Sequence, residues 1–399
     1  MRLRPTLVLA LTLFDRPSSI PISYPDIMAS EKRPARREDF RIAIICAMPL
    51  EYDAVSLIFD TFFDEEGDPY GKAPGDTNQY TTGRIGRHDV VLVLLSDVGK
   101  APAAGAAASV RSSYTRLELA LLVGVCGGVP YVGTDEVLLG DVVISKMVVQ
   151  YDFGRQYSHR FKIKDTIEDC LGRPNKTIRG LIALFETEMG RARLHKKAAE
   201  RLQDLQAAAE GRRADYCYPG PNKDKLFKPT YLHRHRKACN ECGERPCDDA
   251  ASASCEELCC EAEYLVSRKR LDKKQQVALE LAQAPTIFVG RIGSGDSVMR
   301  SSQRRDELAK EQQLVAFEME GAGVWDEVPC IVIKGISDYA DSHKDTLKLW
   351  HNFAAATAAA TTRAVLERYS PADHGGPAEA VLYQVAQHGD LPGQQPSEL

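Results

Sequence analysis

The sequence lacks an excess of positive charge, a long apolar run and a rich supply of aromatic residues. Its 399 residues carry 51 Lys and Arg against 56 Asp and Glu, and the net charge of −5 argues against a dedicated nucleic-acid binder. Two Trp and 12 Phe argue against a broad surface for stacking single-stranded bases. No apolar run reaches the ~18 residues of a membrane-spanning helix. Small molecules or proteins are therefore the expected partners.

The chain also lacks a Gly-X-Y period and a heptad bias, so collagen-like and coiled-coil structures are excluded. Its 44% apolar and 27% charged content is that of a globular protein. Since domains usually span ~100 to 200 residues, length alone suggests two or three of them.

The N-terminus has the charge and the apolar run of a secretory signal over residues 1–14, but no clear small-x-small cleavage site follows before Pro21. Met28 precedes a charged stretch typical of a solvated start. We interpret residues 1–27 as a dispensable extension, predict that residues 1–38 are disordered, and expect a cytoplasmic protein.

The 11 cysteines are unevenly distributed. Six lie within 22 residues, namely Cys239, Cys242, Cys247, Cys255, Cys259 and Cys260. Three others, Cys46, Cys126 and Cys330, fall in apolar strand-like runs, where a free cysteine behaves as a small hydrophobic residue. This pattern indicates a reducing compartment.

Buried-strand patterns alternate with helical ones along two stretches of the chain. Strands are predicted at residues 40–48, 89–100, 117–130 and 136–152, and again in the runs that begin at residues 286, 314 and 328. Helices are predicted at 49–63, 102–117 and 353–366. We predict an α/β fold, a three-layer α/β/α sandwich with a central mixed, largely parallel sheet.

Between these stretches, residues 165–284 change to long charged helices over 177–209, a Pro/Gly/Lys loop, the cysteine cluster and a Lys-rich helix. We predict one catalytic domain over residues 39–369, interrupted by this mostly helical, cysteine-bearing insertion. Residues 370–399, rich in Pro, Gly and Gln, are predicted to form a disordered tail.

Three acids directly follow apolar strands: Glu51, Glu320 and Asp338. Loops at the carboxyl ends of strands form the ligand site in open α/β sheets, and an acid there can donate or accept a proton or a hydroxyl hydrogen bond. The alternative for Glu51 and Glu320 is an acid that stabilises a helix N-terminus.

Six segments give these residues a specific context: AMPLE (47–51), DVGKAPAA (97–104), GVCGG (124–128), SGDSVM (294–299), FEMEGAG (317–323) and KGISDYAD (334–341). In this order they resemble the nucleoside phosphorylase superfamily, most of all its methylthioadenosine/S-adenosylhomocysteine nucleosidases. The run from Phe317 onward is also similar to fungal nucleoside-phosphorylase-like domains that are often fused to NACHT, ankyrin or tetratricopeptide regions.

The resemblance implies roles for the three acids. Asp338 would protonate or hydrogen-bond the purine, which needs a raised pKa near neutral pH. Glu320 would accept hydrogen bonds from ribose hydroxyls, and Glu51 would orient the attacking water. Further substrate-binding positions implied in this way are Met319, Phe317, Val298, Met299, Ser337, Gly99 and Val125.

Hydrolysis of a purine nucleoside is the expected reaction, because the Gly-Asp-Pro loop with which related phosphorylases grip phosphate is missing after the first strand. Phosphorolysis and a non-catalytic nucleoside-sensing module of a fungal immune-receptor-type protein are the alternatives. Val125, Lys334 and Val298 depart from the bacterial nucleosidase pattern and leave the substrate open. The resemblance also implies a homodimer, and no cofactor is expected.

The cysteine cluster contains one CxxC pair, Cys239 and Cys242, followed by Cys247 and preceded by His235. These four residues are weak candidates for structural zinc, which is bound tetrahedrally by thiolates and imidazoles. A second CxxC pair is missing, so a loop of free thiols is the favoured interpretation.

Overall fold

The buried strand expected near the start of the domain is β1 (Ile42–Cys46), whose five residues are all buried. It pairs in parallel with β4 (His88–Leu94) on one side and with β5 (Leu119–Gly128) on the other. The computed structural model describes residues 33–236, 239, 242, 247–343 and 349–371. Apolar, β-branched runs buried on both faces place these strands at the centre of the sheet.

The main sheet has nine strands in the order β12-β11-β8-β13-β5-β1-β4-β3-β2, and β12 also pairs with β5. Its remaining strands are β2 (Thr61–Phe62), β3 (Tyr80–Ile85), β8 (Val142–Gln150), β11 (Ile287–Ser294), β12 (Leu314–Glu318) and β13 (Cys330–Asp338). Pairings of β13 with β5 and of β11 with β8 are parallel, whereas β13 with β8 and β3 with β4 are antiparallel. The predicted α/β class with a mixed central sheet is confirmed.

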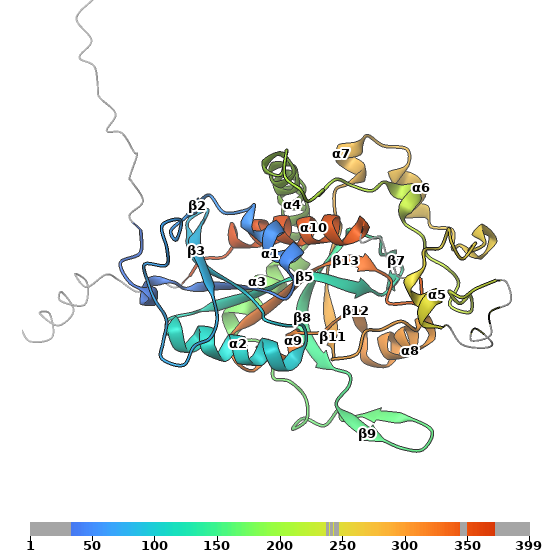
Figure 1. The fold of residues 1–399 in the computed structure, drawn as a ribbon, viewed down its shortest axis with the longest axis horizontal. Helices are drawn as coiled ribbons and strands as arrows, with labels where there is room; N and C mark the ends of the chain where they lie inside the picture. The colour runs from blue at the N-terminus through green and yellow to red at the C-terminus, as the bar shows by residue number, and fades with distance from the viewer. Residues whose placement is uncertain (1–32, 237–238, 240–241, 243–246, 344–348, 372–399) are drawn as a thin grey trace, which may run out of the picture. The chain divides into compact units, whose positions relative to one another are not determined.

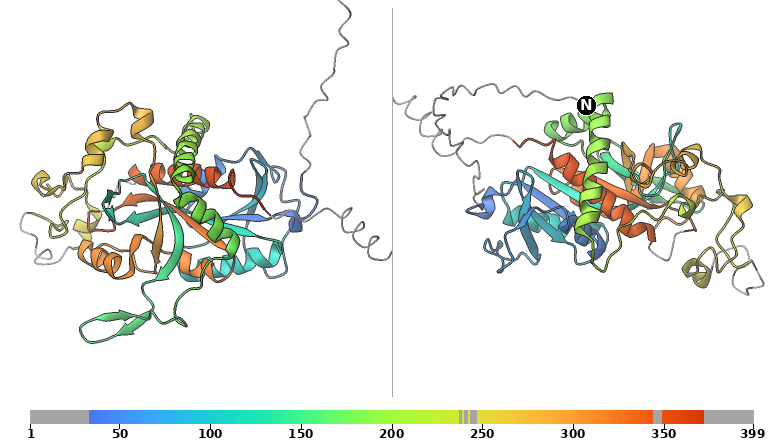
Figure 2. Two further views of the ribbon diagram at one scale, coloured as in Figure 1. Left: turned by 180° about the vertical axis from the view of Figure 1, so that it is seen from behind. Right: turned by 90° about the horizontal axis from the view of Figure 1, so that it is seen from above.

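Helices cover both faces of this sheet (Figure 1). On one face, α1 (Pro49–Ser56) and α4 (Glu188–Ala208) contact α10 (Leu349–Leu366), which packs on β13 and β5; α4 crosses α10 in the views of Figures 1 and 2. On the other, α2 (Lys100–Ser113) contacts α9 (Gly321–Trp325). α8 (Ser302–Gln312) packs on β12.

The segment 165–284 is helical mainly in its first part, so the description "mostly helical" is wrong. α3 (Lys176–Glu186) and α4 are separated at Thr187, whose side chain caps α4 by accepting a hydrogen bond from the Gly190 N–H. After Ala209, prolines and glycines interrupt the pattern and the helices are short: α5 (Asp248–Ser252), α6 (Lys269–Lys274) and α7 (Leu279–Ala282). The boundaries of the insertion remain a prediction.

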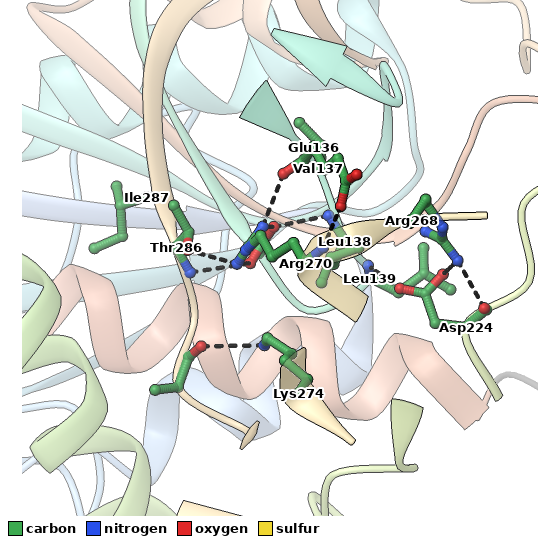
Figure 3. Close-up of polar contacts among 12 residues, drawn as sticks. Glu136, Val137, Leu138, Leu139, Asp224, Arg268, Arg270, Lys274, Thr286 and Ile287 are labelled. Carbon is green, nitrogen blue, oxygen red and sulfur yellow. Dashed lines mark hydrogen bonds and ion pairs between the residues drawn. The ribbon is translucent and has the colours of Figure 1, made fainter. Parts of the chain in front are cut away.

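Ion pairs and hydrogen bonds of charged side chains connect the end of the segment 165–284 to the sheet (Figure 3). Arg268 donates to Asp224 at 2.8 Å, and both side chains are only 1% exposed. Arg270 binds the carboxylate of Asp141, which precedes β8. Asp224 also accepts a hydrogen bond from the hydroxyl of Tyr339, the residue after β13. The insertion therefore supports the carboxyl end of β13, where Asp338 lies.

Within the described ranges, no helix has the length and apolarity needed to cross a membrane. The disorder predicted for residues 1–38 and 370–399 falls almost entirely outside the described residues.

Candidate active site

A pocket opens at the carboxyl ends of β1, β5, β12 and β13, and it contains all three acids predicted from strand ends. Glu51, Glu320 and Asp338 come from different elements, yet each is at most 6% exposed. The pocket wall also contains six of the seven predicted substrate-binding residues: Met319, Phe317, Val298, Met299, Ser337 and Val125. The topology thus brings together residues that are up to 287 positions apart in sequence (51 to 338).

Glu51 is fixed by backbone donors from the residues before α1 and from β5. Its Oε2 accepts hydrogen bonds from the N–H groups of Ala47 (2.9 Å) and Met48 (3.0 Å), and its Oε1 accepts one from Val125 (2.7 Å). A Cβ on Gly124 would lie 2.0 Å from Oε1, so glycine is needed there for the carboxylate to reach β5. Glu51 therefore caps its helix and also faces the pocket.

Burial raises the pKa of Glu51 above its ordinary value, and the nearby Glu320 carboxylate adds to the rise. Lys334 and the backbone donors oppose it. The net effect gives this carboxylate a higher proton affinity than an exposed glutamate has, as a general base near neutral pH requires.

Glu320 is held between a backbone donor and a buried ammonium. Gly99, the residue before α2, donates its N–H to Oε1 at 3.3 Å, and Lys334 Nζ donates to Oε2 at 3.1 Å. Lys334 is completely buried in β13. Gly99 is thus the one predicted substrate-binding residue that does not line the pocket, and it contacts the site through Glu320.

Burial lowers the pKa of the Lys334 ammonium, but three surrounding carboxylates outweigh burial and raise it above its ordinary value. These belong to Glu320, Glu51 and Glu318. The ammonium group of Lys334 therefore attracts the carboxylates of three acids at once, and these acids come from different parts of the chain.

Glu318, at the end of β12, was not predicted. Its Oε2 accepts hydrogen bonds from the N–H groups of Glu320 (3.0 Å) and Gly321 (2.9 Å), which fixes the turn that carries Glu320. Burial raises the pKa of Glu318. The sequence did contain a signal for this role, because Glu318 is an acid in the otherwise apolar strand LVAFE. A buried carboxylate needs hydrogen-bond partners such as these backbone N–H groups.

Asp338, the last residue of β13, is held by its neighbours. Ser337 Oγ donates to its Oδ2 at 3.1 Å, and the Ala340 N–H donates to its Oδ1 at 2.8 Å. Ala340 has a positive φ of 51°, unusual for a residue with a Cβ, so the chain turns sharply behind the carboxylate. A Cβ on Gly127 would lie 3.0 Å from Oδ1, which shows how closely β5 approaches.

Apolar and aromatic side chains complete the pocket. Tyr151 and Phe317 meet edge to face with ring centroids 5.5 Å apart, and Val298 at the loop after β11 is 52% exposed. The Tyr151 hydroxyl donates to the carbonyl of Ser297 at 2.7 Å. Sequence reasoning missed Tyr151; it follows a strand, like the acids, but its aromatic character does not separate it from a core residue.

An ion-pair network links the loops around the pocket. Lys100 Nζ donates to Asp152 at 2.6 Å, and the Lys100 N–H donates to Asp296 at 2.9 Å. Asp152 in turn accepts from the Asp296 N–H at 2.9 Å. Two arginines of the hairpin formed by β3 and β4 do not line the pocket: Arg84 pairs with Asp89, and Arg87 donates to the carbonyl of Tyr369.

The four weak metal candidates lie together. One possible ligand atom from each of His235, Cys239, Cys242 and Cys247 falls within 4.8 Å of the others. His235 Nδ1 is 3.2 Å from Cys242 Sγ and 3.6 Å from Cys247 Sγ. This arrangement suits a tetrahedral cation, and a zinc ion here remains a proposal beside the sequence interpretation of a loop of free thiols.

Comparison with known proteins finds similarity to one family over the first half of the described chain. Residues 41–216 match the model of the Phosphorylase superfamily, and the match includes α3 and α4. A nucleotide-binding leucine-rich repeat (NLR)-like protein of Hyaloscypha variabilis is 32% identical over 340 residues, which cover 84% of this chain. The chain spans about 30% of the length of that relative.

Solved structures show more distant similarity. Futalosine hydrolase of Helicobacter pylori is 17% identical, with 83% of this chain and 99% of that one covered, at a TM-score of 0.48. The methylthioadenosine/S-adenosylhomocysteine nucleosidase of Neisseria meningitidis, in complex with methylthio-immucillin-A, is also 17% identical, with 82% and 99% covered, at a TM-score of 0.47.

Proposed function

We propose, on the premise that the chain belongs to the phosphorylase superfamily through residues 41–216, that it hydrolyses the N-glycosidic bond of purine nucleosides to free base and ribose. The observation that carries the proposal is the convergence of Glu51, Glu320 and Asp338 on one pocket. A dipole-stabilising role alone gives no reason for three acids from three strand ends to face the same space.

Asp338 would act on the leaving purine. Breaking the bond between ribose C1′ and the base leaves negative charge on the base, and a proton or hydrogen bond from an acid at the purine N7 relieves that charge. Ser337 and the Ala340 N–H hold the carboxyl group in one orientation toward the pocket. Proton transfer from a positioned acid contributes about 10²- to 10⁴-fold to the rate.

Glu320 would bind the sugar. Its two oxygens each accept one hydrogen bond from the protein, and a carboxylate has further lone pairs for two ribose hydroxyls. Its negative charge would also stabilise the cationic character that develops on the sugar as the bond breaks. Met319, the preceding residue, would pack beneath the ribose.

Glu51 would position and deprotonate water. Its pKa is raised by burial, and its Oε1 stands beside the Val125 N–H at the pocket wall. Phosphorolysis is less well supported, because no lysine or arginine appears among the described residues that line the pocket and Lys334 is committed to Glu320. Phosphate recognition normally uses such cations.

A nucleoside-sensing module is the second candidate. The similarity to an NLR-like protein over 84% of this chain favours it, since this chain covers only 30% of that relative. By family resemblance we also propose a homodimer. Catalysis and sensing differ in one respect: a sensor binds a nucleoside and leaves it intact.

Isosteric variants separate the two. Asp338→Asn and Glu51→Gln should each lower base release at least 10²-fold while nucleoside binding, followed by calorimetry, is retained. Asp53→Asn removes the same charge from the exposed face of α1 and should leave release unchanged. Binding by the wild type without any base release would reject hydrolysis and support the sensor.

A further inference from the structure

A second group of sulfur and imidazole side chains, separate from the cluster around His235, borders a cavity that Asp338 also lines. Possible ligand atoms of His233, Cys260 and His343 fall within 4.8 Å of one another. Cys260 Sγ is 3.5 Å and Cys255 Sγ 3.8 Å from the same atom, His233 Nδ1. Three of these residues come from the insertion, and His343 comes from the loop after β13.

The ring of His233 is oriented for ligation. Its Nε2 lies 2.9 Å from the carbonyl oxygen of Ala253, which can only accept, so Nε2 carries the proton. Nδ1 therefore presents a lone pair to the two thiols. Histidines that bind metal almost always donate their other N–H to a backbone carbonyl or a carboxylate in this manner.

His343 offers an unsatisfied atom. Its side chain is 4% exposed and stacks on Phe227 with centroids 4.1 Å apart. Its Nδ1 lies 4.0 Å from Asp341 Oδ1, whereas its Nε2 is buried without a hydrogen-bond partner among the described residues. A buried imidazole nitrogen needs a partner. A metal ion bound to Nε2 would supply that partner.

The backbone between Cys255 and Cys260 forms an unusual turn. The Cys260 N–H donates to the carbonyl of Cys255 at 2.8 Å, and Cys259 between them has a positive φ of 53°. This strained turn brings both thiols to one histidine. Strain of this kind persists where the surroundings enforce it, often at ligand sites.

We propose that His233, Cys255, Cys260 and His343 bind a structural Zn²⁺ ion, which joins the insertion to the loop that carries Asp338. Zinc binds thiolate sulfur at about 2.3 Å and imidazole nitrogen at about 2.0 Å, so tetrahedral geometry separates N and S ligands by about 3.5 Å. The distance of 3.5 Å from His233 Nδ1 to Cys260 Sγ equals this value, and the distance of 3.8 Å to Cys255 Sγ is 0.3 Å longer. Binding releases the two thiol protons.

The site is independent of the proposed reaction, but it has a consequence for the pocket. His343 follows Asp338 by five positions, and Asp341 accepts the His343 N–H at 2.8 Å. A metal at His343 would hold this short loop against the insertion. With the cluster of His235, Cys239, Cys242 and Cys247, the chain would carry two zinc ions.

Metal analysis of the purified full-length chain by plasma mass spectrometry tests the site. The wild type should contain two equivalents of zinc. Cys260→Ser and His343→Ala should each lose one equivalent, and His343→Cys, which restores a ligand, should regain it. Cys170→Ser replaces an exposed cysteine outside both clusters and should change nothing.

Wild-type protein without zinc would overturn the proposal, as would unchanged zinc content in both Cys260→Ser and His343→Ala. If these variants do not fold, the cobalt-substituted wild type still decides. Two tetrahedral sites predict intense visible absorption from two equivalents of Co²⁺, whereas saturation at one equivalent, abolished by Cys242→Ser, would leave no metal at His343.

Discussion

Lys334 is the residue whose replacement tests the electrostatics of the site most severely. It is completely buried, its Nζ lies 3.1 Å from Glu320, and the carboxylates of Glu51 and Glu318 also face it. Lys334→Met keeps an unbranched side chain of similar length and removes the charge. The carboxyl groups of Glu51, Glu318 and Glu320 then lie buried without a neighbouring ammonium group.

The expected loss of stability is large. Removing one partner of a buried ion pair costs about 3–5 kcal/mol, because the remaining charge stays buried without compensation. Lys334→Arg keeps the charge at the same position and should lose about 1–3 kcal/mol, the cost of fitting the wider guanidinium into a packed site. The comparison separates charge from packing.

The loss should also depend on pH. Burial raises the pKa of Glu51 and Glu318 above 4.5, and Lys334 counters part of that rise. A carboxyl group whose folded pKa is raised contributes stability that is complete below the unfolded pKa and is lost as pH rises through the folded pKa. Without Lys334 the folded pKa values rise further, so Lys334→Met should be more destabilised at pH 8 than at pH 5.

Urea denaturation at both pH values measures this directly, with stability taken from linear extrapolation. We expect the difference between Lys334→Met and wild type to grow by at least ~1.4 kcal/mol from pH 5 to pH 8, the equivalent of one pKa unit. A loss below ~1 kcal/mol at pH 8, or a larger loss at pH 5, would refute the reasoning.

Two further predictions concern the packing of Gly124 against Glu51 and the buried ion pair between Arg268 and Asp224. Gly124→Ala places a Cβ 2.0 Å from Glu51 Oε1, and we expect it to lower base release about 10²-fold because it displaces the carboxylate. Gly105→Ala is the control: a Cβ there meets nothing within 4 Å, so the rate should be unchanged. Arg268→Met leaves Asp224 buried without its ion pair and should cost about 3–5 kcal/mol in urea denaturation; adding Asp224→Leu should recover part of the loss, and no recovery would mean that packing dominates.

The strand ends were the most predictable part of the molecule. Residues 42–46 are continuously apolar and β-branched, so β1 and the acid that follows it could be recognised from sequence. The helix after it was predicted too long: it ends at Ser56, and Phe62 lies in β2, paired with Gly83 of β3. A two-residue strand is defined by its partner, which the spacing of apolar residues does not reveal.

Long-range partners could not be predicted. Glu318 and Lys334 each look like an isolated charge in an apolar strand, and only the topology shows that they surround the same space. His233 and His343 are 110 residues apart, and no spacing rule connects them.

α8 was missed because its sequence is strongly charged and buries little besides Leu308 and Arg305.

Release of free base from a panel of purine nucleosides, with and without phosphate, tests the central claim most directly. Adenosine, inosine and guanosine derivatives would be incubated with the purified chain, and base and sugar products separated by chromatography. Hydrolysis predicts free base and ribose at the same rate in both buffers for at least one nucleoside. Release only in the presence of phosphate, with ribose 1-phosphate as product, would contradict it, and so would the absence of release from every nucleoside.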